Sequence, residues 1–205
     1  PDIAGARAFY QPLLGWDVRE NDMGAMGIYY IFTKDGCEVA AGFGHTPEMQ
    51  GVPPHWAAYI SVPNADAAVE KAKAAGGALV MGPFDVGQGD QKHGRTAMLR
   101  DPQGAHFNVW QAYGHAGIEL VGDPGALIWT QLNTTDTAGA KKFYSQVIGW
   151  TPQDMPNPTG GTYTTWGRPG IEGPASGAGG MMEMPPGSPA PAHWLSYWGT
   201  ADVNA

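Results

Sequence analysis

The chain has 205 residues, with 11 Lys and Arg against 19 Asp and Glu, and therefore a formal net charge of −8. This acidic balance argues against nucleic acid as a partner, because nucleic-acid binding needs clustered basic side chains. No apolar run approaches the roughly 20 residues of a membrane span, and the single cysteine, Cys37, fits a reducing compartment, so we expect a cytoplasmic protein.

The predicted elements alternate one helix with several short strands. The first helix runs from Ile3 to Leu14, because Asp2 can cap its start and Gly15 can end it. Three strands separated by glycine turns follow, at Trp16–Arg19, Ile28–Thr33 and Glu38–Gly42. The same order then returns as a strand, a helix capped by Asn64 or Asp66, and three strands: Trp56–Val62, a helix ending at Ala75, Ala78–Met81, Thr96–Arg100 and Ala105–Trp110. This order predicts an α+β fold with a helix on one face of each small sheet.

An internal repeat defines the domain organisation. Residues 2–16 recur as residues 136–150, and His55-Trp56-Ala-Ala-Tyr59 recurs as His193-Trp194-Leu-Ser-Tyr197. Two matches in the same order predict a duplicated unit, too long for a solenoid repeat. We therefore predict a first domain at residues 1–115, a linker at 116–125 and a second domain at 126–205.

The two copies differ at their ends. An alternating apolar stretch, Ala126–Asn133, precedes the second copy of the helix and predicts a strand, whereas nothing equivalent precedes Asp2. The first copy continues well past Ala67, whereas the second stops at the partner of that residue, Ala205. We expect the first copy to lack its opening strand, the second to lack its last third, and the natural protein to be longer.

Two motifs carry a family resemblance. Asp-x-x-x-Ala-x-x-Phe-Tyr-x-x-x-x-Gly-Trp occurs in both copies, and the first copy adds Gly94-Arg95-Thr-Ala-Met-Leu-x-Asp101-Pro102-Gln103-Gly104-x-x-Phe107. Together they resemble the vicinal oxygen chelate superfamily, which holds glyoxalase I, extradiol dioxygenases and bleomycin-resistance proteins. The two-copy layout is similar to bacterial glyoxalase-like proteins often labelled hydroxylases. The resemblance implies tandem glyoxalase-like domains built of paired βαβββ units, whose cup-shaped sheets hold a divalent metal through His and Glu.

The ligand positions implied by this resemblance hold other residues. The first histidine belongs seven residues before the helix-capping Asp, where the second copy has Trp129. The next histidine position holds Ala57, and the glutamate position of the last strand holds Asn108. We therefore expect no usual metal site and no cofactor.

One alternative keeps a divalent metal. His55 and His106 each lie two residues before a missing ligand, so strand alternation places them on the same side as that ligand. With Glu38, they would form a displaced site of two histidines and one carboxylate. The competing interpretation is that His55 and His193 end their strands and bond to solvent or loop backbone.

Alternation also predicts a ligand pocket. Five side chains fall on the inward faces of the predicted cups, namely Tyr59, Asn108, Trp110, Trp129 and Gln131. Aromatic rings with a few polar groups suit a flat organic ligand. The alternative is that these rings fill a closed core.

Other segments point to structure more than to chemistry. We expect the Phe9-Tyr10 and Phe143-Tyr144 pairs to pack their helices, and Cys37 to be an unreactive bystander. Asp90–His93 is predicted to lie in a glycine-rich loop, with His93 as an alternative acid-base group. Glu172–Ala192 is predicted to be a loop that either closes over a cup or simply links two strands.

Three functions stay open. The first is a metal-independent binder of a small hydrophobic or aromatic compound. The second is a metal-dependent lyase, isomerase or oxygenase of the same superfamily. The third is a structural or interaction protein. The lost ligand positions favour the binder, with a small molecule as partner, no nucleic acid and no membrane. The protein would be a monomer of two domains or a homodimer.

Overall fold

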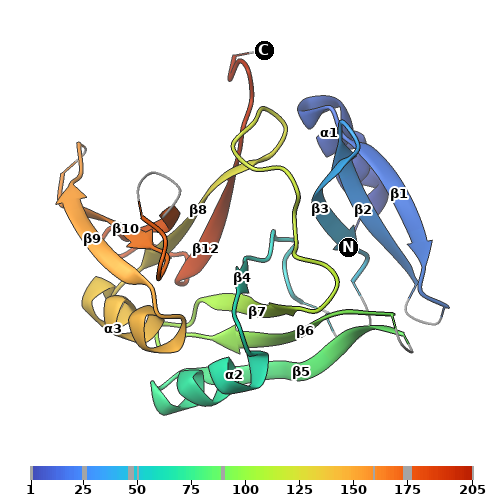
Figure 1. The fold of residues 1–205 in the computed structure, drawn as a ribbon. Helices are drawn as coiled ribbons and strands as arrows, with labels where there is room; N and C mark the ends of the chain where they lie inside the picture. Colours follow the sequence, from blue (N-terminus) through green and yellow to red (C-terminus); the bar gives the residue numbers. More distant parts are fainter. Residues whose placement is uncertain are drawn as a thin grey trace. The chain divides into compact units, whose positions relative to one another are not determined.

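The computed structural model describes residues 2–24, 27–45, 49, 51–88, 91–158, 160–172 and 177–204. These residues form three helices and twelve strands in an α+β fold (Figure 1). They divide into two compact units: unit 1 comprises Pro1–Trp56, Gly117–Ile128 and Tyr197–Ala205, and unit 2 comprises Ala57–Ala116 and Trp129–Ser196. Each unit thus contains parts of both repeats, and the domain boundaries at 115 and 126 stay a prediction. None of the described helices is both long and apolar enough to cross a membrane.

Unit 1 begins with the predicted helix. Helix α1 spans Ile3–Leu14, and the carboxylate of its N-cap, Asp2, accepts a hydrogen bond from the backbone N–H of Gly5 at 2.8 Å. Gly15 ends the helix with φ +68°, a left-handed conformation that favours glycine. A three-stranded antiparallel sheet follows in the order β1-β2-β3, with bounds Asp17–Asp22, Ile28–Lys34 and Cys37–Phe43.

A four-stranded sheet with one helix forms the first half of unit 2. The elements are β4 (Tyr59–Ser61), α2 (Ala65–Ala74), β5 (Ala78–Gln88), β6 (Gln91–Arg100) and β7 (His106–Ala112), and the sheet order is β4-β7-β6-β5. Of the two predicted caps of α2, Asn64 is the one used, because its side chain accepts from the N–H of Ala67. The loop predicted at Asp90–His93 was wrong from Gln91 onward, since β6 begins at that residue and includes Lys92 and His93; Asp90 lies outside the described residues.

A five-stranded sheet with one helix completes the fold. Its elements are β8 (Leu127–Thr134), α3 (Thr137–Val147), β9 (Thr151–Pro156), β10 (Thr162–Gly167), β11 (Gly177–Glu183) and β12 (His193–Trp198), and the sheet order is β12-β8-β11-β10-β9. The predicted loop Glu172–Ala192 was wrong in its middle, because β11 lies between β8 and β10. The glycines of this segment predict a loop, but Gly179 is needed in the strand because the backbone of β8 lies close to it. A Cβ at residue 179 would lie 2.7 Å from the carbonyl oxygen of Thr130.

The two helices of unit 2 share one core with the sheet faces next to them. Phe107 of β7 packs against Phe143 and Tyr144 of α3, with ring centroids 6.1 and 5.4 Å apart. Ile60, Val109 and Leu132 are buried in the same cluster, and α2 lies along the four-stranded sheet (Figure 1). Each sheet therefore turns one face to this core and leaves its other face without a helix.

The repeat is visible as two matching aromatic clusters. In unit 1, Tyr10 stacks on Trp16 at 5.9 Å and its hydroxyl accepts from the indole N–H of Trp56 at 3.1 Å. In unit 2, Tyr144 stacks on Trp150 at 6.1 Å and accepts from Trp194 at 3.0 Å. The duplicated motifs thus build the same packing arrangement twice.

The two clusters differ in what surrounds them. The hydroxyl of Tyr144 donates to the carboxylate of Asp101 at 3.0 Å, and the backbone N–H groups of Gln103 and Ala105 also donate to that carboxylate. Burial raises the pKa of Asp101 and the pKa of Tyr144. Phe143 is 2 % exposed whereas its counterpart Phe9 is 59 % exposed, so the structural interpretation of the Phe-Tyr motif is confirmed for Phe143, Tyr144 and Tyr10 but not for Phe9.

This difference predicts unequal effects of one substitution. Tyr144→Phe leaves a buried Asp101 oxygen and the Trp194 indole N–H without their shared partner, so we expect the free energy of unfolding to fall by about 2–4 kcal/mol. Tyr10→Phe removes only the partly buried bond from Trp56 and should cost about 1 kcal/mol. Denaturant unfolding followed by tryptophan fluorescence measures both, and equal losses would contradict the assignment.

Candidate functional site

Trp129 and Gln131 lie on the helix-free face of the five-stranded sheet. Side chains alternate between the two faces along β8, and Leu132 is buried in the shared core. Trp129, Gln131 and Asn133, at odd-numbered positions of the same strand, therefore point to the opposite side. Two other strands of the sheet add a polar side chain each to this side, Tyr163 from β10 and His193 from β12. We call this surface the β8 face and define it by Trp129, Gln131, Asn133, Tyr163 and His193.

The five side chains of the β8 face form one continuous hydrogen-bond chain. The indole N–H of Trp129 donates to the Tyr163 hydroxyl at 2.7 Å, and that hydroxyl donates to Gln131 Oε1 at 3.0 Å. Gln131 Nε2 donates to Asn133 Oδ1 at 2.8 Å, and Asn133 Nδ2 lies 3.1 Å from His193 Nε2. His193 Nδ1 finally lies 2.8 Å from the carbonyl oxygen of Pro191.

Both ends of this chain impose the same direction on it. An indole N–H can only donate, so the Tyr163 oxygen accepts and its proton points to Gln131. At the other end a carbonyl oxygen can only accept, so Nδ1 of His193 carries the proton. In the neutral ring Nε2 must then accept from the Asn133 amide. The orientations of both side-chain amides follow from these constraints.

A glycine makes room for the chain. A Cβ at residue 180 would lie 2.5 Å from Tyr163 Cζ and closer still to the hydroxyl, so the tyrosine ring lies directly over Gly180 of β11. Gly180 is paired with Gln131 on the neighbouring strand. The missing side chain therefore allows Tyr163 to reach Gln131 across β11.

Tyr59, Asn108 and Trp110 lie together on the helix-free face of the other sheet. Tyr59 pairs with Asn108, and its ring centroid is 6.5 Å from that of Trp110. Tyr59 is 59 % exposed, whereas Asn108 is 5 % exposed. The Trp110 indole lies over Gly94, where a Cβ would be 2.7 Å from Cε2. The five predicted pocket residues thus form two groups, on two different sheets of unit 2.

The residues at the implied metal positions do not fit a metal. Trp129 presents an N–H that is already donated, and Ala57 offers no ligand atom. Asn108 offers an uncharged amide instead of a carboxylate. Within either unit, the described residues contain no group of three or more His, Cys, Asp or Glu that could hold a metal ion.

The candidates for a displaced metal site have other local partners. Glu38 of β3 accepts a hydrogen bond from the guanidinium of Arg19, and His55 Nδ1 lies 2.9 Å from the carbonyl oxygen of Pro53. His193 makes the matching contact to Pro191, so this bond to loop backbone is also repeated. His106 is exposed at the start of β7. Glu38 and His55 belong to unit 1 and His106 to unit 2.

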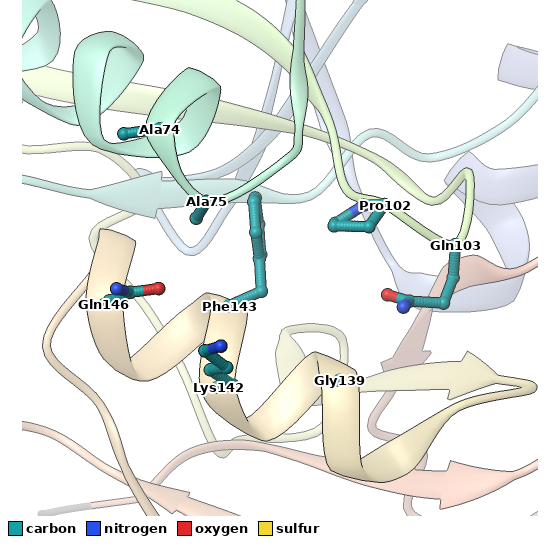
Figure 2. Close-up of a pocket in the computed structure, with 8 residues that line it drawn as sticks. All are labelled: Ala74, Ala75, Pro102, Gln103, Gly139, Lys142, Phe143 and Gln146. Atoms are coloured by element: carbon teal, nitrogen blue, oxygen red, sulfur yellow. The ribbon is translucent and has the colours of Figure 1, made fainter.

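A pocket of about 250 Å³ lies on the helix side, between α2, α3 and the turn after β6 (Figure 2). Figure 2 shows Phe143 rising from α3 between Ala75 and Pro102. The complete lining is Ala74, Ala75, Pro102, Gln103, Gly139, Lys142, Phe143 and Gln146. Among these residues only Lys142 is charged, so the lining offers no acid-base pair for catalysis.

Sequence reasoning missed three members of the β8 face. Asn133 follows Gln131 in the same alternation and could have been included by that signal. His193 was considered only as a strand end. Tyr163 carried no signal, because its position depends on the order of strands in the sheet.

Comparison with known proteins gives consistent similarities. The sequence profile described as "Glyoxalase/Bleomycin resistance protein/Dioxygenase superfamily" matches residues 1–109. "Putative glyoxylase CFP32" of Mycobacterium tuberculosis is 36% identical over 206 residues, covering 100% of this chain and 75% of the relative. "Anthracycline biosynthesis protein DauV" of Streptomyces sp. is 32% identical over 223 residues, covering 100% and 75%. The Mn(II)-bound glyoxalase from Novosphingobium aromaticivorans has a similar fold, with a TM-score of 0.52, 16% identity, and coverage of 80% of this chain and 54% of that chain.

The glycine under Tyr163 gives a direct test of the hydrogen-bond chain. Gly180→Ala forces the Tyr163 ring to move, which breaks its bonds to Trp129 and Gln131. We expect the Trp129 indole N–H signal in an NMR spectrum to shift and its exchange with solvent to accelerate. Gly167→Ala on β10 is the control, since a Cβ there meets its nearest atom at 3.6 Å. An unchanged Trp129 signal in Gly180→Ala would contradict the chain.

Proposed function

Because the chain belongs to the glyoxalase/bleomycin resistance protein/dioxygenase superfamily, we propose that it binds a small hydrophobic or aromatic compound without the usual metal ligands of that superfamily. The compound would lie in a cup-shaped cavity lined by the β8 face. Since one fold supports many activities, this proposal rests on the side chains of that face and not on the fold.

The hydrogen-bond chain of the β8 face is the observation that carries the proposal. It occupies the sheet surface where the superfamily resemblance implies a metal ligand, and it includes Trp129 at that position. Its groups are neutral amides, aromatic rings and one imidazole, which suit an uncharged ligand with an aromatic surface. A divalent metal ion in this superfamily is held by several imidazole and carboxylate ligands, whereas the five side chains of the β8 face include one imidazole and no carboxylate.

The names of two relatives support the same class of ligand. DauV and DnrV, from Streptomyces sp. and Streptomyces peucetius, are both named anthracycline biosynthesis proteins. Anthracyclines are flat compounds of fused rings, and aromatic side chains stack favourably on such rings. We take a planar polycyclic compound as the ligand class for this chain as well.

A metal-dependent enzyme is the second candidate. The observation that favours it is the similarity to a protein named as a glyoxylase, at 36% identity over the whole of this chain. In that case the protein would be a lyase, isomerase or oxygenase with ligands other than those at Trp129, Ala57 and Asn108. A third candidate, an interaction protein, has no comparable observation in its favour.

The binding proposal predicts saturable binding of planar aromatic probes. Anthracene-2-sulfonate and anthraquinone-2-sulfonate should each bind, as measured by isothermal titration calorimetry. Trp129→Ala should weaken both by about tenfold or more, because it removes an aromatic surface from the β8 face. Trp110→Ala, on the other sheet, is the control and should leave both affinities within about twofold. Loss of binding with Trp110→Ala alone would overturn the assignment to the β8 face.

The proposal also predicts a protein that needs no metal. Protein purified without chelator or affinity metal should contain far less than one equivalent of Mn, Fe, Ni or Zn, as measured by mass spectrometry. Chelator treatment should leave probe binding unchanged. About one equivalent of metal, lost in His55→Ala or His106→Ala, would overturn the metal-free proposal and establish the second candidate.

A further inference from the structure

We infer that the side-chain amides of Gln131 and Asn133 form a pair of N–H donors that holds a keto oxygen of a planar aromatic ligand. This inference rests on the proposed function and specifies the ligand further, as an aromatic ketone or quinone. The hydrogen-bond chain leads to it, because it leaves these two donors, and no other polar hydrogens of the five side chains, without a partner among the described residues.

Counting the polar hydrogens of the β8 face identifies the pair. The indole N–H of Trp129, the hydroxyl of Tyr163 and the Nδ1–H of His193 are each used once within the chain. Gln131 Nε2 and Asn133 Nδ2 carry two hydrogens each and use one each. One N–H therefore stays available on each amide group.

The two available N–H groups lie close together, and both belong to side chains of β8. Gln131 and Asn133 are two residues apart on β8 and so share a face, and their amide groups are in contact at 2.8 Å. A carbonyl oxygen has two lone pairs and can accept from both amides at once. Paired amide donors of this kind also serve as oxyanion holes in enzymes.

Burial makes an acceptor from a ligand favourable for these donors. Gln131 is only 7 % exposed, so its unused N–H is largely shielded from water. A buried N–H without an acceptor costs free energy. A buried carbonyl oxygen that accepts only one of its two possible hydrogen bonds costs less, so the unused donors matter more here than unused lone pairs. A ligand that brings an acceptor oxygen therefore gains more from this site than a ligand that brings only hydrocarbon.

The neighbouring groups fix the pair in place. His193 holds Asn133 through its Nε2, and Tyr163 holds Gln131 through its hydroxyl. Rotation of either amide would break a bond at one end of the chain, so the donors are oriented before a ligand arrives. Such preorganisation lowers the entropy lost on binding.

The experiment compares two probes that differ in their keto oxygens. Anthraquinone-2-sulfonate and anthracene-2-sulfonate share a ring system and a sulfonate, so the ratio of their affinities isolates the contribution of the keto groups. In the wild-type protein we expect calorimetry to give about tenfold tighter binding of the quinone. In Gln131→Glu and Asn133→Asp, which remove the N–H donors at nearly constant shape, the ratio should fall to about one.

One control and one further donor variant keep the result interpretable. Gln153→Glu makes the same change on β9, in the same cross-strand row as Gln131, and should leave the ratio unchanged. Gln131→Met removes the donor without adding a charge and should lower the ratio as Gln131→Glu does. Since both probes carry the same sulfonate, its repulsion from a new carboxylate cancels in the ratio, and Gln131→Met excludes repulsion between that carboxylate and the keto oxygens.

The outcomes separate this inference from the proposed function. If neither probe binds the wild-type protein, the proposed function fails. If both probes bind with equal affinity, or if the ratio survives in all three donor variants, the donor pair is overturned while the proposed binding stands. A ratio that falls in the donor variants and persists in Gln153→Glu supports both.

Discussion

Asp101 is the anchor on which the arrangement of unit 2 depends. Its carboxylate accepts hydrogen bonds from two backbone N–H groups of its own turn and from the hydroxyl of Tyr144 on α3. One buried side chain therefore joins the end of the first repeat to the helix of the second. The bond is costly to break, since each partner would be left buried and unsatisfied. Because α3 is held there, the sheets of unit 2 both turn their helix sides to one core, and their other faces carry no helix.

Much of the local structure could be predicted because its causes are local. Asp2 and Gly15 determine the ends of α1 through a side-chain acceptor and a left-handed backbone, and both are visible in the sequence. The family was also recognisable, because its motifs recur in order. The strand at Gly177–Glu183 was missed because glycine usually weakens a strand, and only contact with Thr130 and Tyr163 explains its presence there.

The boundaries of the compact units differ from the boundaries of the sequence repeat. A repeat marks where a gene segment was duplicated, whereas a core forms wherever apolar faces meet. Phe107 of the first copy meets Phe143 of the second, and no periodicity within either copy contains that information. The candidate site shows the same limit: alternation found Trp129 and Gln131, while Tyr163 and His193 join them only through the order of strands.

The common direction of the hydrogen bonds on the β8 face has a cooperative consequence. Hydrogen bonds that follow one another from donor to acceptor polarise one another and so strengthen one another. From the Trp129 indole to the Pro191 carbonyl, every donor points onward along the chain. The chain runs from β8 to β10 and back before it reaches β12, so the shared order of donors and acceptors couples side chains of three strands, and the loss of one bond weakens the bonds that follow it.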